Sequence, residues 1–179
     1  IDPHDWRVIY TSTENGGFRR YDAATYRASG GEPTPARITN LAAWYPQDTA
    51  PRFRFNWSAP LVMSPHDPST IYLGGNHLFR TRDGGTTWTI LGPDRSTNDP
   101  VKTRAGGSGG ITPDNTGAET HGTLTTFAPS PVRADLFWAG TDDGNVQLSR
   151  DGGATWTNVR PNVPGMPAHT WVGRIEASR

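Results

Sequence analysis

Two almost identical octets, 68 residues apart, constrain the fold of this chain more than any other feature. Residues 81–88 read TRDGGTTW, and residues 149–156 read SRDGGATW. One octet of this kind could arise by chance, whereas two copies indicate a repeated structural unit. Units of this size stack on their neighbours because each of them cannot bury its apolar face alone. The sequence therefore predicts an array of repeats.

Each octet has the composition of a β-hairpin whose turn is bonded internally. The Asp carboxylate can accept backbone N–H groups within the turn, and the hydroxyl two residues before it can do the same more weakly. The second Gly allows a positive φ, and the Trp begins the returning strand with a large apolar face. We therefore interpret these octet residues as structural rather than catalytic: Thr81, Asp83, Gly85, Thr87, Trp88, Ser149, Asp151, Gly153, Thr155 and Trp156.

The residues around the octets repeat as well. In both units a Ser-Pro pair precedes a short apolar segment that ends in Gly, at residues 64–74 and 130–140. No window has a sustained 3.6-residue apolar period, so we expect almost no helix. Four short antiparallel strands in each unit predict an all-β fold, a β-propeller fragment of four-stranded blades. We expect these strands near residues 57–63, 70–74, 77–81 and 86–91, and again near 122–128, 136–140, 145–149 and 154–159.

The repeat divides the chain into parts of one propeller. Residues 29–52 and 92–118 have the length and composition of loops that decorate one rim of the ring. The outermost units have apolar strands with open edges, whereas a stable array is capped by polar repeats. We therefore expect the rest of the ring, or other copies of the chain, as partners. The expected parts are a degenerate blade with a rim loop (1–52), a blade (53–91), a Gly/Pro-rich loop (92–118), a blade (119–160) and the first strand of a further blade (161–179).

Charge and composition exclude several classes of partner. The 17 basic residues balance the 17 acidic residues, so nothing predicts binding to nucleic acid. No apolar run is long enough for a transmembrane helix, and the lack of Cys excludes disulfides and thiolate metal sites. Asp142 and Asp143 could bind Ca²⁺, but a hairpin turn suits the pair better because no further acidic residues follow at loop spacing. We expect no metal and no cofactor.

The two octets resemble the Asp box, also called the BNR repeat, of sialidases, xyloglucan-degrading glycoside hydrolases and sortilin-type receptors. The wider context is most similar to large bacterial propeller proteins of the sortilin-like group, through residues 57–61, 138–144 and 171–178. This resemblance implies a propeller fold in which the Asp box is structural, and it is specific for the fold rather than for an activity. It also implies an extracellular or periplasmic protein.

Polar and aromatic residues lead into, or form, the first strand of each unit, which lines the central channel of a propeller. Trp and His rings can stack on sugars, and Arg can hold a carboxylate through two hydrogen bonds. The same groups could instead satisfy one another around a water-filled channel. The candidate ligand-binding residues are Arg54, Asn56, Trp57, His121, His169, Trp171 and Arg174.

Two functions remain open at this point. The first, which we favour, is a propeller scaffold that binds a peptide, a protein or a glycan at its rim or in its channel. The second is an extracellular glycoside hydrolase, which needs two carboxylates facing one cleft. Glu119 and Glu176 are the candidate catalytic acids on the channel side. The absence of an evident acid pair or nucleophile is the reason for favouring the binding function.

Overall fold

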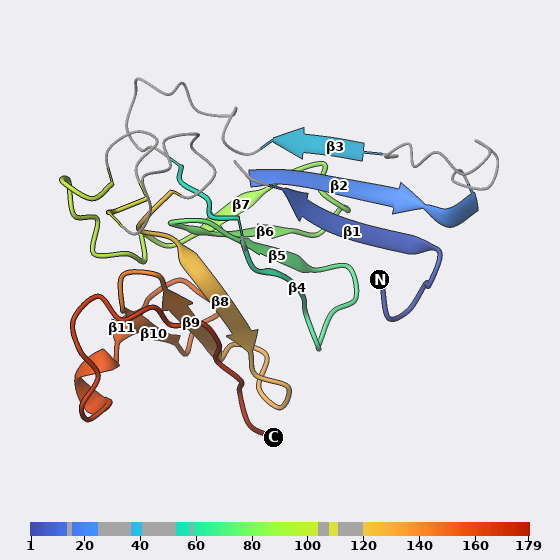
Figure 1. Cartoon of the computed structure of the whole chain (residues 1–179). Helices are drawn as coiled ribbons and strands as arrows, with labels where there is room; N and C mark the ends of the chain where they lie inside the picture. Colours follow the sequence, from blue (N-terminus) through green and yellow to red (C-terminus); the bar gives the residue numbers. More distant parts are fainter. Residues whose placement is uncertain (14–15, 25–36, 41–52, 58, 104–107, 111–119) are drawn as a thin grey trace.

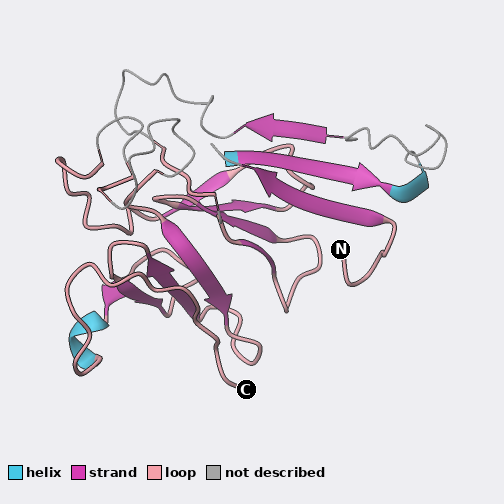
Figure 2. Ribbon diagram, in the orientation of Figure 1, coloured by secondary structure: helices cyan, strands magenta, loops and turns pink. Residues whose placement is uncertain are grey.

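The computed structural model describes residues 1–13, 16–24, 37–40, 53–57, 59–103, 108–110 and 120–179. These residues form three antiparallel sheets (Figure 1, Figure 2). The first sheet contains β1 (Val8–Thr13), β2 (Gly17–Asp22) and β3 (Arg37–Asn40). The second contains β4 (Leu61–Met63), β5 (Ile71–Gly74), β6 (Leu78–Thr81) and β7 (Thr89–Leu91). The third contains β8 (Leu124–Pro129), β9 (Phe137–Thr141), β10 (Val146–Ser149) and β11 (Thr157–Asn158).

The second and third sheets confirm the predicted four-stranded units. Their strands are neighbours in chain order, and each strand overlaps its expected range. This order follows from short turns, since antiparallel neighbours can be joined by a tight connection. Asp142 and Asp143 lie in the turn between β9 and β10, as expected, and Gly144 completes that turn with a φ of 95°.

Helix is confined, within the described residues, to short turns such as η3 (Arg160–Asn162). The near absence of helix that the sequence predicts is confirmed for this part of the chain. None of these turns has the length or apolar character that a membrane crossing requires.

Two segments differ from the sequence-based expectation. β3 lies within residues 29–52, which we expected to be a rim loop, and it pairs with β2 along its whole length. The rest of 29–52 and part of 92–118 fall outside the described residues. Residues 170–179 form no strand, and the backbone N–H of Val172 donates to the Thr141 carbonyl at 3.1 Å. The segment thus lies against the third sheet, and its role as the start of a further blade stays a prediction.

The two central strands of the second sheet, β5 and β6, are largely buried on both faces. Alternate residues of a strand point to opposite faces, so that on β5 Leu73 contacts the first sheet while Tyr72 contacts the third. Each core is shared by two sheets, as in a propeller. The core towards the first sheet contains Phe18, Phe53, Phe55, Ala59, Ile71, Leu73 and Phe79. The core towards the third sheet contains Tyr72, Leu78, Leu91, Leu124, Phe127, Phe137 and Ala139.

The octets form hairpin turns that are bonded through their own side chains. Thr81 Oγ1 donates to Asp83 Oδ1 at 2.8 Å and accepts the N–H of Gly85 at 2.9 Å. Asp83 also accepts the N–H of Thr87 at 2.9 Å and its hydroxyl at 2.7 Å. The equivalent bonds of the second octet join Ser149, Asp151, Gly153 and Thr155.

These bonds keep both octet carboxylates ionised. Hydrogen bonds from the backbone and side chain of Thr87 lower the pKa of Asp83 to about 2. Hydrogen bonds from Thr155 lower the pKa of Asp151 to about 2 in the same way. A general acid needs a pKa near the working pH, so these two carboxylates are suited to holding a turn and unsuited to donating protons.

Each hairpin packs on the sheet that precedes it in the chain. The Trp88 ring meets the Phe18 ring edge to face, at a centroid distance of 5.1 Å and an angle of 79°. Gly85 lies so close that a Cβ there would be 2.3 Å from the Phe18 ring. Gly153 of the second octet faces Leu91 of the second sheet in the same way, with a Cβ distance of 3.1 Å.

Replacing Gly85 by Ala is expected to lower the free energy of unfolding by about 2–3 kcal/mol. The left-handed backbone costs an L side chain about 1–2 kcal/mol, and a methyl group forced against Phe18 adds an overpacking cost of about 1 kcal/mol or more. Urea unfolding followed by Trp fluorescence measures the change.

Gly84→Ala is the matched control for this substitution. Gly84 also has a positive φ, of 66°, but among the described residues a Cβ there meets only the Arg20 side chain, at 3.5 Å. We therefore expect Gly84→Ala to show the backbone cost alone. Equal losses in the two variants would contradict the close packing of Gly85 on Phe18.

Candidate functional site

Polar side chains gather where one end of the second sheet meets the third. The β5–β6 turn, the β9–β10 turn and the segments leading into β4 and β8 all reach this end. Asn76 N–H donates to the Arg54 carbonyl at 2.9 Å, and Leu124 N–H donates to the Gly75 carbonyl at 2.9 Å. Strand ends thus hold the backbone of this region in place. We call this group the polar site: Arg54, Asn76, Asp94, Ser96, Thr97, His121, Asp142 and Asp143.

Arg54 forms a buried ion pair at the centre of the polar site. Its Nη2 donates to Asp94 Oδ2 at 2.8 Å, to Ser96 Oγ at 3.0 Å and to the Gly122 carbonyl at 3.2 Å. The Arg54 side chain is 7% exposed and that of Asp94 is 21% exposed. Burial raises the pKa of Asp94, but the attraction of Arg54 and hydrogen bonds from Ser96 and Asn76 outweigh it, so the pKa lies below its ordinary value. The guanidinium of Arg54 is therefore engaged within the protein.

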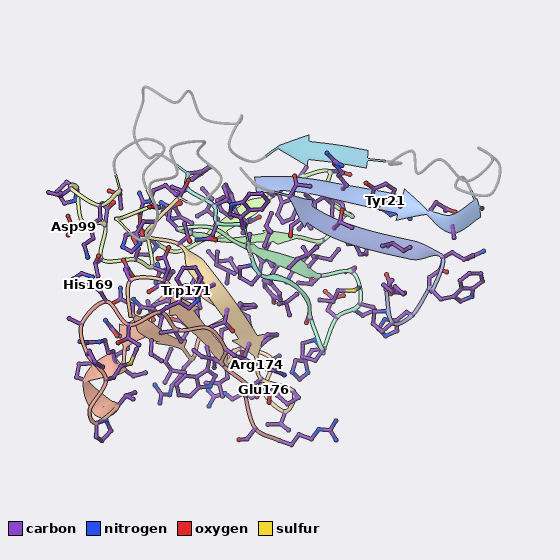
Figure 3. The ribbon with its side chains drawn as sticks, in the orientation of Figure 1. Tyr21, Asp99, His169, Trp171, Arg174 and Glu176 are labelled. Atoms are coloured by element: carbon purple, nitrogen blue, oxygen red, sulfur yellow. The ribbon has the colours of Figure 1, made fainter. Side chains whose placement is uncertain are left out.

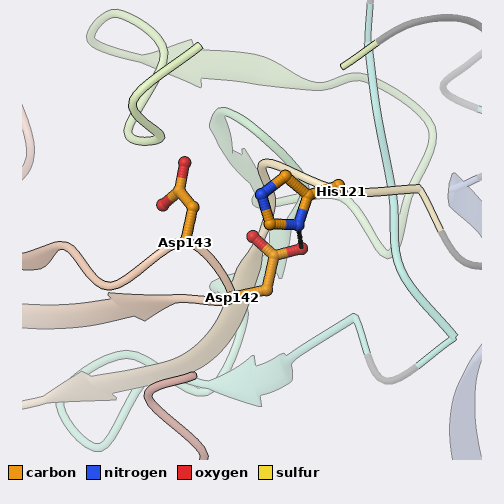
Figure 4. A group of neighbouring side chains, drawn as sticks. All are labelled: His121, Asp142 and Asp143. Carbon is orange, nitrogen blue, oxygen red and sulfur yellow. Dashed lines mark ion pairs between the residues drawn. The ribbon is translucent and has the colours of Figure 1, made fainter. Parts of the chain in front are cut away.

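His121 lies against Asp142, with Nδ1 3.7 Å from Oδ2 (Figure 4). The imidazole is 4% exposed, and neither ring nitrogen has a hydrogen-bond partner among the described residues. Asp142 Oδ1 accepts the N–H groups of Gly122 at 3.0 Å and Thr123 at 2.9 Å. Burial raises the pKa of Asp142 despite these hydrogen bonds and the nearby imidazole.

Asp143 ties the β9–β10 turn to the residues that follow β7. Its Oδ2 accepts the N–H of Thr97 at 2.6 Å and the Thr97 hydroxyl at 2.8 Å. Its Oδ1 accepts the hydroxyl of Thr141. Together, His121, Asp142 and Asp143 place ligand atoms, one from each residue, within 4.8 Å of one another. One imidazole and two carboxylates are a donor set that can hold a metal ion.

Two of the seven expected ligand-binding residues, Arg54 and His121, belong to the polar site. They meet at Gly122, whose carbonyl accepts from Arg54 and which follows His121 in the chain. Asn56 is also buried, and its carbonyl accepts the N–H of Ala59 at 3.2 Å. Trp57, in contrast, is 59% exposed. Within residues 54–57, the side chains of Arg54 and Asn56 are therefore buried, whereas the indole of Trp57 is exposed.

Three further candidates, Trp171, Arg174 and Glu176, lie along the C-terminal segment, which runs beside the third sheet (Figure 3). The N–H of Ile175 donates to Thr126 Oγ1 of β8 at 3.1 Å, which fixes the segment on that strand. Trp171 is 43% exposed. Arg174 and Glu176 form an ion pair with each other and are both exposed. These three side chains are open to a ligand.

Two other candidates are placed differently. His169 is exposed and has a φ of 56° in the left-handed region. Glu119 lies outside the described residues. The suggested pairing of Glu119 with Glu176 as catalytic acids thus stays a prediction.

Several members of the polar site were not predicted from the sequence. Asn76 was not among the candidate site residues, and Asp94, Ser96 and Thr97 fell within a stretch expected to be a loop. The available signal was the matching place of Asn76 and Asp142 in the two repeat units, since both follow the second strand of a four-stranded sheet. Two polar residues at equivalent strand ends indicate one shared polar surface.

Comparisons with known proteins find the fold but no family. No family model and no curated protein sequence matches the chain. Among solved structures, it is similar to the GH74 xyloglucanase from Xanthomonas campestris, with a TM-score of 0.53 and 19% identity over 89% of this chain and 20% of that chain. It is similar to the GH74 enzyme of Niastella koreensis, with a TM-score of 0.51 and 17% identity over 99% of this chain and 22% of that chain. An ancestral GH74 enzyme matches with a TM-score of 0.50 and 16% identity over 89% of this chain and 17% of that chain.

The chain spans about a fifth of the length of the first two of these structures. At such low identity, the likeness carries information on the fold alone. It agrees with the antiparallel four-stranded sheets and with the cores shared between them. The chain is all-β and has the fold of part of a β-propeller.

Proposed function

We propose that this chain is part of a ligand-binding β-propeller that holds a glycan along its inner strands. The observation that carries the proposal is the exposure of two indoles, Trp57 at 59% and Trp171 at 43%. Trp57 precedes β4 and Trp171 lies in the segment beside β8, and these strands come first in their sheets. An exposed indole offers a flat apolar face and an N–H donor, which together suit a sugar ring.

The neighbouring charges support the same class of ligand. Arg174 and Glu176 are exposed on the segment that carries Trp171, and they can bond sugar hydroxyls from both donor and acceptor sides. The net charge of zero favours a neutral ligand over a polyanion. Arg54, whose donors are engaged within the polar site, acts in this proposal as part of the framework that holds the inner strands.

The proposal includes the finer assignments suggested by the sequence. The two octets are Asp boxes of the sortilin-like group, and the protein works outside the cell or in the periplasm. The rest of a ring, or other copies of the chain, completes the binding surface. One similar structure is that of a xyloglucanase, so xyloglucan oligosaccharides are the first ligand to test.

Isothermal titration of the chain with xyloglucan oligosaccharides tests the proposal. We expect binding in the wild-type protein, and a loss of affinity of about threefold to tenfold for each of Trp57→Ala and Trp171→Ala, equivalent to about 0.7–1.4 kcal/mol. Trp6→Ala is the matched control, because this indole is 64% exposed but lies before β1 in the first sheet. Unchanged affinity in both inner-strand variants, or preference for a peptide over every glycan, would overturn the glycan assignment.

Hydrolysis of the glycan is the second candidate function, favoured by the likeness to GH74 enzymes. A glycosidase needs two carboxylates across one cleft, and Glu176 is an exposed acid on the segment that carries Trp171. A reducing-end assay with Glu119→Gln and Glu176→Gln tests this candidate. Turnover that survives both substitutions would clear these residues of catalysis, and no turnover on any polysaccharide would leave binding as the function.

A further inference from the structure

Three buried side chains of the polar site have metal-ligating atoms close to one another. Some of these atoms make few or no hydrogen bonds among the described residues. We propose that His121, Asp142 and Asp143 bind one divalent transition-metal ion, with Zn²⁺ as its representative. Their ligand atoms lie within 4.8 Å of one another, and all three residues are at least nine-tenths buried. This site is independent of the glycan surface on the exposed indoles.

The hydrogen bonds around the two carboxylates leave one oxygen of each with capacity to spare. Among the described residues, Asp142 Oδ1 accepts two backbone N–H groups, whereas Oδ2 accepts only the Thr123 hydroxyl, at 3.2 Å. Within the same part of the chain, Asp143 Oδ2 accepts two bonds from Thr97, whereas Oδ1 accepts only the Thr141 hydroxyl. A carboxylate oxygen has two lone pairs. The hydrogen bonds thus orient each carboxylate and leave a lone pair on one oxygen for a metal.

The imidazole of His121 is the independent observation that points to a ligand. It is 4% exposed, and both of its nitrogens lack a hydrogen-bond partner among the described residues. A buried polar group without a partner costs about 1–3 kcal/mol, so two in one ring need an explanation. A metal on one nitrogen supplies it.

The surroundings of the ring fix its direction. A Cβ on Gly109 would lie 2.4 Å from the His121 ring, so the glycine backbone lies directly against the imidazole. The Nδ1 atom also lies 3.7 Å from Asp142 Oδ2 (Figure 4). Groups that orient a ligand in this way raise the affinity of a site for its metal.

The donor set selects the class of ion. Ca²⁺ prefers six to eight oxygen ligands, whereas a site with imidazole and carboxylates suits Zn²⁺ and its neighbours. Ligand atoms of a tetrahedral zinc site lie about 3.4 Å apart, so binding must draw the three groups together from the 4.8 Å spread. Three protein ligands leave a fourth position for water or for a further group.

The test is a titration of chelator-treated protein with ZnCl₂, followed by calorimetry, together with Co²⁺ absorption as a direct report of the ligand geometry. We expect one equivalent of Zn²⁺ to bind and a tetrahedral Co²⁺ spectrum to appear and then vanish when Zn²⁺ is added. His121→Phe keeps a flat ring and removes both nitrogens, and its affinity for Zn²⁺ should fall more than tenfold. Asp143→Asn should weaken binding as well.

His77→Phe is the matched control, because His77 is another buried histidine, 9% exposed, outside the three-residue cluster. It should bind Zn²⁺ as the wild type does. Should His121→Phe fail to fold, the imidazole ¹⁵N spectrum of the wild type decides, since only one of its five histidines should shift on adding Zn²⁺. No binding, equal binding in His121→Phe, or binding of Ca²⁺ alone would overturn the proposal and leave an ordinary His–Asp pair.

Discussion

Replacing Phe79 by Ala is expected to lower the free energy of unfolding by about 3–5 kcal/mol. Phe79 is 1% exposed and lies in the core shared by the first and second sheets. Its ring meets the Phe53 ring edge to face at 4.9 Å and stacks on the Phe55 ring at 5.5 Å. Truncation leaves a cavity that these rings fill only in part, because both are packed within the short segment that precedes β4. Urea unfolding measures the loss.

Ile90→Ala is the matched control for Phe79→Ala. Ile90 is the direct cross-strand partner of Phe79 in the same sheet, but it is 36% exposed. Its loss should change the stability far less, within about 1 kcal/mol. Similar losses in the two variants would show that strand pairing, rather than the shared core, carries the stability of this sheet.

Replacing Arg54 by Met is expected to lower the free energy of unfolding by about 3 kcal/mol. Removal of one partner from a buried ion pair costs about 3–5 kcal/mol, and the low end applies because Asn76 and Ser96 still bond the Asp94 carboxylate. The substitution keeps the apolar stem and removes the guanidinium. Chemical unfolding at neutral pH gives the value.

The ion pair between Arg54 and Asp94 predicts that the free energy of unfolding depends on pH. The pKa of Asp94 lies below its ordinary value in the folded protein. The ionised Asp94 carboxylate therefore stabilises the fold fully at a pH above the ordinary pKa, and this stabilisation is lost as the pH falls through the lowered pKa. Without Arg54, the largest of the effects that lower the pKa of Asp94 is lost, so this pKa rises relative to the wild type. The stability gap between wild type and Arg54→Met should therefore shrink on acidification.

Arg174→Met is the control for the Arg54 variant. The Arg174 side chain is 80% exposed in its ion pair with Glu176, and exposed pairs contribute little. We expect no measurable change in its unfolding. A gap for Arg54→Met that stays constant or widens as the pH falls would contradict the buried ion pair with Asp94.

Local chemistry explains what the sequence predicted well. The octet bonds join residues at most four positions apart, for example Thr87 to Asp83, so their composition alone predicts the turn. The strand ranges followed from the same turns, because each hairpin sets where its two strands begin and end. Asp142 and Asp143 formed the expected turn for the same reason.

The polar site depended on contacts that sequence patterns do not encode. Arg54 meets Asp94 across 40 residues and Gly122 across 68, and Asp143 meets Thr97 across 46. Asp94 and Thr97 lie in a stretch without hydrophobic periodicity, so the sequence does not indicate which of its carboxylates is buried. β3 was missed because its partner β2 is also separated from it by a long connection, and four residues carry too little pattern to be recognised.

The packing of the hairpins gives the array a direction. Gly85 and Trp88 meet Phe18, and Gly153 meets Leu91, so both hairpins rest on residues that precede them in the chain. During translation those upstream residues leave the ribosome first. The residues against which each hairpin packs have therefore already been synthesised when the hairpin emerges. The direction of this packing therefore matches the order of synthesis, so each hairpin can cover Phe18 or Leu91 as soon as it leaves the ribosome.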